Sequence, residues 1–225
     1  MTLIPKLFRA VRGLTAREGI ARGFYQPRVR HRAALALVDA SGRFLEIGCG
    51  REFFLELEEV ALTAPKLETV GIDNATDQLR SFTRTYLDNH GGTAAHLVGA
   101  RAEALPFPDG TFEVASCLNT LYNLPSIDVV CIFLLEMARV LKPGGRCLID
   151  IRNRWNLPTA LRFILRHWHD PAFPYHLKTY STAELEGALE GTGLHPVRLH
   201  RIGLLKSPLC PVILFELEKK DGWEA

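Results

Sequence analysis

The sequence predicts a doubly wound α/β fold: a mostly parallel sheet of about seven strands, covered by helices on both faces and closed by a C-terminal antiparallel hairpin. Short apolar runs alternate along the chain with longer segments of helical periodicity. A glycine turn directly follows the first apolar run. The length of 225 residues and the charged fraction of 23% are typical of one globular domain of this class. We therefore expect residues 1–225 to form a single domain.

The first two thirds of the chain alternate between the two patterns. We expect strands over residues 43–47, 67–72, 95–98, 111–118 and 146–151, and helices over 53–61, 77–87 and 127–141. The last of these helices should end at the Lys-Pro-Gly-Gly run of residues 142–145, because proline cannot continue a helix.

The final third predicts one helix and one hairpin. Ser181 and Glu184 have the spacing of a capping box, so a helix should begin after Ser181. The apolar runs 197–202 and 211–217 can pair as an antiparallel hairpin. Between the fifth strand and Ser181, residues 152–180 form a long connection, and such segments are often lids or binding loops.

Composition excludes several classes of protein. A net charge of +2 gives no field that attracts nucleic acid, so we do not expect a nucleic-acid partner. The sequence contains no run of about 18 apolar residues, so we expect no membrane-spanning helix. The five cysteines lie in or beside apolar runs without a CxxC pair, which indicates reduced, mostly buried thiols in a cytoplasmic protein. His167 and His169 lack a further ligand at a defined spacing, so we expect no metal.

The N-terminal segment, residues 1–40, is basic and has helical periodicity. Residues 1–43 carry nine Lys and Arg side chains against two acids. Apolar residues between Leu3 and Leu14 fall on one helical face, and the basic residues take the other. One interpretation is an ordinary surface helix with a solvated basic face. The other is a helix that docks on an anionic membrane or partner.

The turn after the first strand suggests a nucleoside ligand. Gly48 and Gly50 allow a sharp turn and let a ligand approach the backbone, and Asp73 ends the next strand, where a carboxylate can accept both ribose hydroxyls. Position 53 is Phe rather than the third glycine of a dinucleotide fingerprint, which argues against a nicotinamide-dependent oxidoreductase. Glu46 would repel a phosphate and suits an amine-bearing ligand.

At four places in order, the sequence resembles class I S-adenosylmethionine (SAM)-dependent methyltransferases of the small-molecule branch, which includes ubiquinone and menaquinone biosynthesis enzymes. The stretches are Leu45-Glu-Ile-Gly-Cys-Gly50, Gly71-Ile-Asp73, Ala102-Glu-Ala-Leu-Pro-Phe-Pro-Asp-Gly-Thr-Phe-Glu-Val114 and Ala138-Arg-Val-Leu-Lys-Pro-Gly-Gly145. Together they span residues 43–151, and four ordered motifs are more specific than any one. The resemblance implies a Rossmann-like fold with SAM as cofactor.

The resemblance also implies roles for individual residues. Gly48, Cys49 and Gly50 would wrap the methionine part of SAM, with Glu46 near its amino group. Asp73 would bind the ribose hydroxyls and Asn74 would flank the adenine. In the other half of the site, Arg101 stands where relatives often have an acid, the Ala102 amide could meet the adenine ring, and Asn119 and Leu121 would contact the methionine part.

The acceptor side is defined less sharply. Residues 152–180 combine basic and aromatic side chains, which suit a planar or lipidic acceptor with a carboxylate or phosphate, or else an amphipathic lid with a solvated basic face. His176 is a candidate general base and Tyr122 could orient an acceptor hydroxyl. The expected reaction is methyl transfer from SAM to an oxygen or carbon of a small anionic, aromatic or lipidic acceptor. The alternative is a non-catalytic SAM-fold protein that docks through its basic N-terminal helix.

Overall fold

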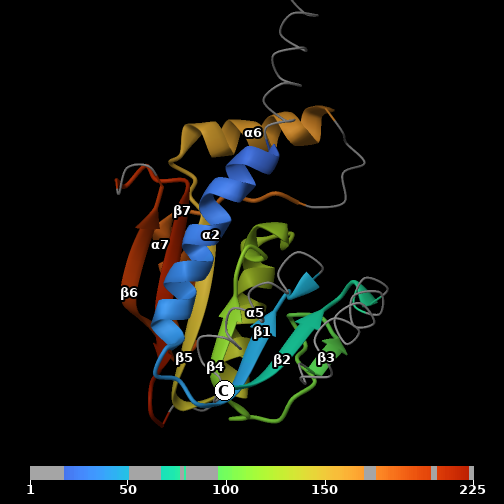
Figure 1. Cartoon of the computed structure of the whole chain (residues 1–225), viewed down its shortest axis with the longest axis vertical. Helices are drawn as coiled ribbons and strands as arrows, with labels where there is room; N and C mark the ends of the chain where they lie inside the picture. The colour runs from blue at the N-terminus through green and yellow to red at the C-terminus, as the bar shows by residue number, and fades with distance from the viewer. Residues whose placement is uncertain are drawn as a thin grey trace, which may run out of the picture.

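The computed structural model describes residues 18–50, 67–76, 79, 96–169, 176–203 and 207–222. These residues form a seven-stranded sheet in the order β3-β2-β1-β4-β5-β7-β6 (Figure 1). The strands are β1 (Gly42–Ile47), β2 (Leu67–Asp73), β3 (His96–Gly99), β4 (Phe112–Cys117), β5 (Leu141–Arg152), β6 (Leu194–Ile202) and β7 (Val212–Lys219). Strands β1 to β5 pair in parallel, whereas β7 runs antiparallel to both β5 and β6. The predicted fold class and hairpin are confirmed.

Helices lie on both faces and at one end of this sheet. They are α2 (Glu18–Leu37), the 3-10 turn η1 (Leu121–Asn123), α5 (Ile127–Val140), α6 (Leu157–His169) and α7 (Thr182–Leu189). Buried residues of α2 join one hydrophobic cluster, and those of α5 and α7 join another. Figure 1 shows α6 lying across the end of the sheet where the parallel strands finish.

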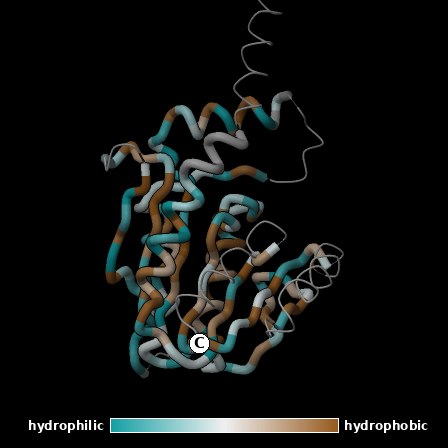
Figure 2. Tube along the Cα trace, viewed as in Figure 1, coloured by the Kyte–Doolittle hydropathy of each residue, from teal (hydrophilic) through white to brown (hydrophobic). Residues whose placement is uncertain are grey.

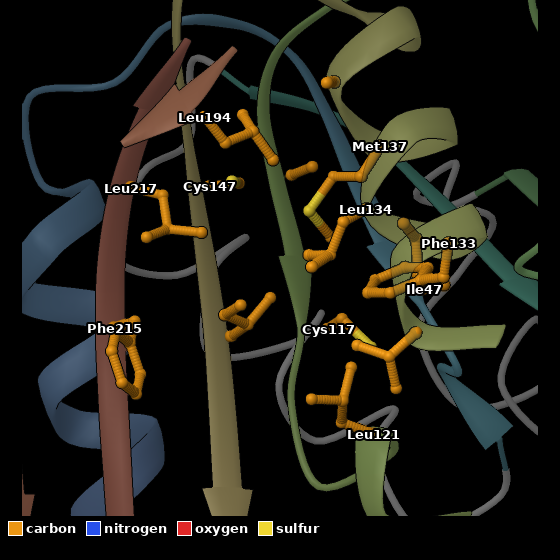
Figure 3. Packing of buried hydrophobic residues seen from close by; sticks show 14 of the residues in the cluster. Ile47, Cys117, Leu121, Phe133, Leu134, Met137, Cys147, Leu194, Phe215 and Leu217 are labelled. Carbon is orange, nitrogen blue, oxygen red and sulfur yellow. The ribbon is translucent and has the colours of Figure 1, made fainter. Parts of the chain in front are cut away.

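Alternation along the strands builds the two clusters. On β1, Leu45 and Ile47 face the cluster that contains α5, whereas Phe44 faces the cluster that contains α2. Figure 3 shows Ile47 in the same core as Met137 of α5, and Figure 2 shows the apolar residues concentrated along the central strands. Burial on both faces is what a parallel strand in a covered sheet requires.

The boundary between α5 and β5 and the start of α7 can be compared with the sequence predictions. Helix α5 ends at Val140, one residue before the predicted end, but β5 begins at Leu141 rather than at residue 146. Leu141 pairs with Phe112, and the register shifts before the next pair, so the Pro-Gly-Gly run is absorbed as an irregularity within the strand. The capping box of α7 is confirmed, because the Ser181 hydroxyl accepts the Glu184 amide at 3.2 Å and Glu184 accepts the Ser181 amide at 2.8 Å.

Several sequence predictions lie outside the described residues. These are the helix over 53–61, nearly all of the helix over 77–87, and the amphipathic stretch before residue 18. All five cysteines are free thiols, and four are buried, as expected. Within the described ranges, no helix has the length and apolarity needed to cross a membrane. Among the same residues, no group of three acidic, histidine or cysteine side chains could hold a metal ion.

Candidate active site

Four connections meet at the edge of the sheet where the parallel strands end. They are residues 48–50 after β1, 74–75 after β2, 119–123 after β4 and 153–154 after β5. Ligands of open α/β sheets bind at this edge. It is the edge across which α6 lies in Figure 1.

The structure shows a packing reason for glycine at position 48 that the sequence alone did not show. Its φ is +77°, and a Cβ there would lie 2.3 Å from Oγ1 of Thr120. We expected the missing side chain to leave room for a ligand, but Thr120 fills that space. The glycine therefore lets the turn after β4 pack directly on the turn after β1, and the two halves of the site are in contact.

The backbone amides of the first turn are used within the protein. The Gly48 and Cys49 N–H groups donate to the Ile72 carbonyl at 2.8 and 2.9 Å, and the Gly50 N–H donates to Oδ2 of Asp73 at 2.9 Å. A phosphate needs free N–H donors, so residues 48–50 are a poor phosphate cradle. Their carbonyl oxygens suit a ligand that donates hydrogen bonds, such as an ammonium group.

Both carboxylate oxygens of Asp73 accept hydrogen bonds from backbone amides. One carboxylate oxygen accepts the Gly50 amide and the other accepts the Ala75 amide at 2.8 Å, so the side chain joins the ends of β1 and β2. It is half-buried, and each oxygen keeps a further lone pair. The geometry therefore leaves Asp73 able to accept two neighbouring hydroxyls. Asn74, next to it, is exposed at the rim.

Glu46 and Cys49 lie below the surface of this edge. Both side chains are 0% exposed, and Cys49 packs where Gly71 has no Cβ. Burial, followed by the negative charges of Glu46 and Asp73, raises the pKa of the Cys49 thiol well above its ordinary range. A protonated, buried thiol is a poor nucleophile, so Cys49 acts as a small residue packed beneath the turn. Any contact of Cys49 with a cofactor would come from its backbone.

The end of β4 provides a buried donor. Asn119 is 3% exposed and has a left-handed backbone with φ of +55°. Its N–H donates to the carboxylate of Asp150, while its side-chain Nδ2 is buried without a hydrogen-bond partner among the described residues. A buried donor without a partner is costly, so Nδ2 is suited to an acceptor on a ligand.

Asp150 is a residue that sequence reasoning missed. It is buried at the end of β5, accepts the Asn119 amide, and forms an ion pair with Arg152. The signal was present, because residues 147–151 are apolar except for this acid. A charged side chain in such a strand is retained only with partners.

Tyr122 and Leu121 follow on η1 and face different surroundings. Leu121 is fully buried in the core, as Figure 3 shows, so only its backbone could touch a cofactor. The Tyr122 ring is also buried and lies beneath the Arg152 guanidinium at 4.9 Å. Phe163 of α6 lies beside the same ring, with 5.8 Å between the centroids. Tyr122 thus connects the end of the sheet to α6.

The connection 152–180 begins and ends at one place. The Tyr180 N–H donates to the Arg152 carbonyl, and the Arg154 N–H donates to the Tyr180 carbonyl, each at 2.9 Å. The Lys178 N–H donates to the Tyr122 carbonyl at 2.7 Å, so the exposed His176, two residues earlier, returns toward the same edge. Thirteen residues of this connection form α6, so a helix anchored at the sheet edge is part of the expected lid segment.

The loop after β3 completes the edge. The Ala100 amide donates to the Asp73 carbonyl at 3.1 Å, which keeps this loop beside Asp73. Arg101 is exposed and pairs with Glu103 at 3.1 Å, whereas Ala102 is half-buried against the main cluster. The Arg101 charge is therefore partly offset by its own neighbour.

Comparison with known proteins identifies this architecture. Residues 19–199 match the family model described as a methyltransferase domain. The chain belongs to this methyltransferase family. The resemblance seen at four motifs is confirmed, and this is a class I SAM-dependent methyltransferase domain with SAM as its cofactor. The arrangement fits that molecule, because Asp73 can accept ribose hydroxyls and Asn119 presents a buried donor.

Two curated relatives indicate which chemistry similar chains carry. A fatty-acid O-methyltransferase from Mycolicibacterium smegmatis is 32% identical over 148 residues, which are 65% of this chain and 50% of the relative. A ubiquinone/menaquinone biosynthesis C-methyltransferase from Hahella chejuensis is 39% identical over 88 residues, which are 39% of this chain and 34% of the relative. The chain spans about half of these relatives' length or less.

Solved structures share the fold. The YcgJ protein of Bacillus subtilis superposes with a TM-score of 0.64 at 17% identity, over 87% of this chain and 99% of that one. A SAM-dependent methyltransferase from Clostridium acetobutylicum gives a TM-score of 0.67 at 12% identity, over 95% and 99%. At such identities the likeness shows the fold, a Rossmann-like sheet with the predicted strand arrangement.

Proposed function

We propose that the protein transfers the methyl group of SAM to an oxygen or carbon of a small lipidic or aromatic acceptor that carries an anionic or ionisable group. The observation that carries this proposal is the Asp73 carboxylate, held by the Gly50 and Ala75 amides at the edge where a nucleoside would bind. The relatives named as fatty-acid and quinone methyltransferases support the acceptor class.

The chain's own residues would hold the two reactants in line. Asp73 would accept the ribose hydroxyls, with Asn74 beside the adenine and the Ala102 amide toward the ring. The Gly48 carbonyl and the buried Glu46 would receive the ammonium group, and Asn119 Nδ2 would donate to the carboxylate. When bound, SAM supplies a methyl group on a positively charged sulfur, and an aligned nucleophile can accept this methyl group as the C–S bond breaks and neutral S-adenosylhomocysteine leaves.

The acceptor would enter between the end of β4 and α6. Tyr122 lies there between Arg152 and Phe163, and α6 would exclude water from the reacting groups. A hydroxyl acceptor must lose its proton, and His176 would take it on the imidazole ring, whereas a carboxylate acceptor is already ionised at neutral pH. A carbon acceptor activated by its own hydroxyl needs less help. Arg154 and Lys178 are exposed beside this opening and suit an anionic group on the acceptor.

The test is methyl transfer from labelled SAM to two acceptors, a saturated fatty acid and a prenylated naphthohydroquinone. We expect label in the organic extract with at least one of them. Asp73→Asn should lower the rate about tenfold or more at subsaturating SAM, whereas Glu68→Gln, an exposed residue at the opposite end of β2, should not. Transfer to neither acceptor, or equal rates for Asp73→Asn and the wild type, would contradict the proposal.

A non-catalytic docking protein is the second candidate. It is favoured by the many Lys and Arg residues before residue 43. Residues 1–17 of this segment lie outside the described residues. The same assay separates the two functions, because a docking protein would transfer no label to any acceptor.

A further inference from the structure

Helix α6 turns its apolar face outward. Leu157, Leu161, Ile164 and Trp168 recur at spacings of four, three and four residues, which places them in one stripe along the helix. Their side chains are between 56 and 75% exposed, whereas Thr159 and Phe163 on the opposite side are buried. An ordinary surface helix has the reverse arrangement, so this stripe requires an apolar partner.

The stripe continues beyond the helix into one surface, which we call the α6 face: Trp155, Leu157, Leu161, Ile164, Trp168 and Leu209. The outlying members, Trp155 and Leu209, are each 61% exposed. The Asn156 side chain holds the two segments together, because its Nδ2 donates to the Leu209 carbonyl at 2.8 Å. Figure 2 shows apolar residues recurring along α6 at the end of the molecule. A tryptophan thus lies toward each end of the face, and tryptophan is the side chain most favoured at the boundary between lipid and water.

The segment that carries the α6 face is predominantly basic. Residues 152–169 contain four arginines and no aspartate or glutamate. Of these, Arg152 and Arg154 have acidic partners, Asp150 and Glu184, and Arg162 lies over the Phe163 ring at 5.5 Å. The first 17 residues of the chain add four basic residues and no acid. They precede α2, which begins at the same end of the molecule as α6 in Figure 1.

We propose that the α6 face binds the surface of an anionic lipid bilayer, with its apolar side chains among the lipid chains and the basic residues at the headgroups. Surface helices that insert in this way combine an apolar face, aromatic residues and basic flanks. A second copy of the chain is a poorer partner, because pairing two such faces would bring two basic regions together. Binding by α6 differs from docking through the N-terminal segment alone.

The α6 face lies close to the candidate acceptor entrance, so membrane binding would serve the proposed reaction. The opposite side of α6 presents Phe163 to Tyr122 at the candidate acceptor entrance, so a bilayer on the outer side would lie one helix away from that entrance. This part of the inference rests on the proposed function. An acceptor with a lipid tail could then pass from the membrane into the site without crossing water.

The test is co-flotation of the full chain with vesicles of phosphatidylcholine alone or of phosphatidylcholine and phosphatidylglycerol in equal parts. We expect binding to the anionic vesicles, weakened by salt, and a loss of about 10- to 100-fold in the double variant Leu161→Gln/Ile164→Gln. The matched control is Ile132→Gln/Leu135→Gln, which removes two exposed apolar residues from α5 and should bind like the wild type.

Three outcomes would overturn the proposal. One is binding by the α6 variant that is no weaker than that of the wild type or of the α5 control, which would place the lipid contact elsewhere. Another is absence of binding to anionic vesicles. The third is a dimer in light scattering that the α6 variant converts to a monomer, which would show that a second copy covers the face. Titration with S-adenosylhomocysteine keeps the tests separate, because it reports the cofactor site, and a variant that retains this binding has folded.

Discussion

The turn after β1 and helix α6 occupy the same end of the molecule but are built in opposite ways. In the turn, the amides of residues 48–50 are all bonded within the protein, and Thr120 fills the space beside Gly48. On α6, by contrast, a continuous apolar stripe faces outward. The cofactor turn is completed within the protein, whereas the outer face of α6 is left open to a partner, which we propose is a lipid bilayer.

The largest loss of stability is expected from a substitution in the turn after β1. Gly48→Ala must hold φ of +77° and place a Cβ 2.3 Å from Thr120 Oγ1, so we expect a loss of about 3 kcal/mol of stability together with weaker cofactor binding. Gly191→Ala is the matched control, because Gly191 has the same φ but no atom within 4 Å of its Cβ position. It should cost about 1 kcal/mol. Urea unfolding measures both, and equal losses would show that Thr120 does not press on the turn.

A smaller effect should come from the link between the two regions. Asp150 holds the Asn119 amide and pairs with Arg152, which covers the Tyr122 ring below α6. Asp150→Asn should therefore cost about 2 kcal/mol, since it leaves a buried guanidinium without its counter-charge. Arg152→Met in the same background should cost less than it does alone. A double-mutant cycle by urea unfolding checks this, and strictly additive losses would show that the pair is not coupled.

The smallest effect should come from a cluster remote from both regions. Glu136 accepts hydrogen bonds from Arg139 at 2.7 Å and from the Leu105 amide at 2.8 Å, and the bond to Arg139 is the main reason why its pKa is lowered. A carboxyl with a lowered folded pKa stabilises the protein above its unfolded pKa, and this stability is lost as the pH falls through the folded value.

Glu136→Gln should therefore cost about 1 kcal/mol at neutral pH, and the difference from the wild type should shrink as the pH falls below about 4. Unfolding curves at several pH values measure it. Affinity for S-adenosylhomocysteine should change little, because the Glu136 contacts are with Arg139 and Leu105 and not with Asp73 or the turn after β1. A deficit that persisted undiminished in acid would mean that the Glu136 charge is not what stabilises this cluster.

The sequence predicted what depends on neighbours along the chain. The strands, the capping box at Ser181, the hairpin and the acid at the end of β2 were all visible in local patterns. The packing of Thr120 against Gly48 was not, because the two residues are 72 positions apart. The bond between Asn119 and Asp150 spans 31 positions. Such contacts depend on the order of strands in the sheet, which local patterns do not define.

The sequence did not predict the outward orientation of the apolar face of α6, for a similar reason. Periodicity identifies which residues share a helical face, but the direction of that face depends on what the helix packs against. Phe163 reaches Tyr122 and fixes the orientation, so the stripe that begins at Leu157 faces away from the sheet. One of the two interpretations of this segment was an amphipathic lid with an exposed basic face, whereas the structure exposes an apolar stripe along α6.

The most direct measurement is calorimetric titration of the purified chain with S-adenosylhomocysteine, run beside NADH and beside the Asp73→Asn variant. We predict micromolar binding of S-adenosylhomocysteine, no binding of NADH, and a loss of about 10- to 100-fold in the variant, with Glu68→Gln unchanged. Binding of NADH in its place, or undiminished affinity in Asp73→Asn, would contradict the assignment of this edge to SAM.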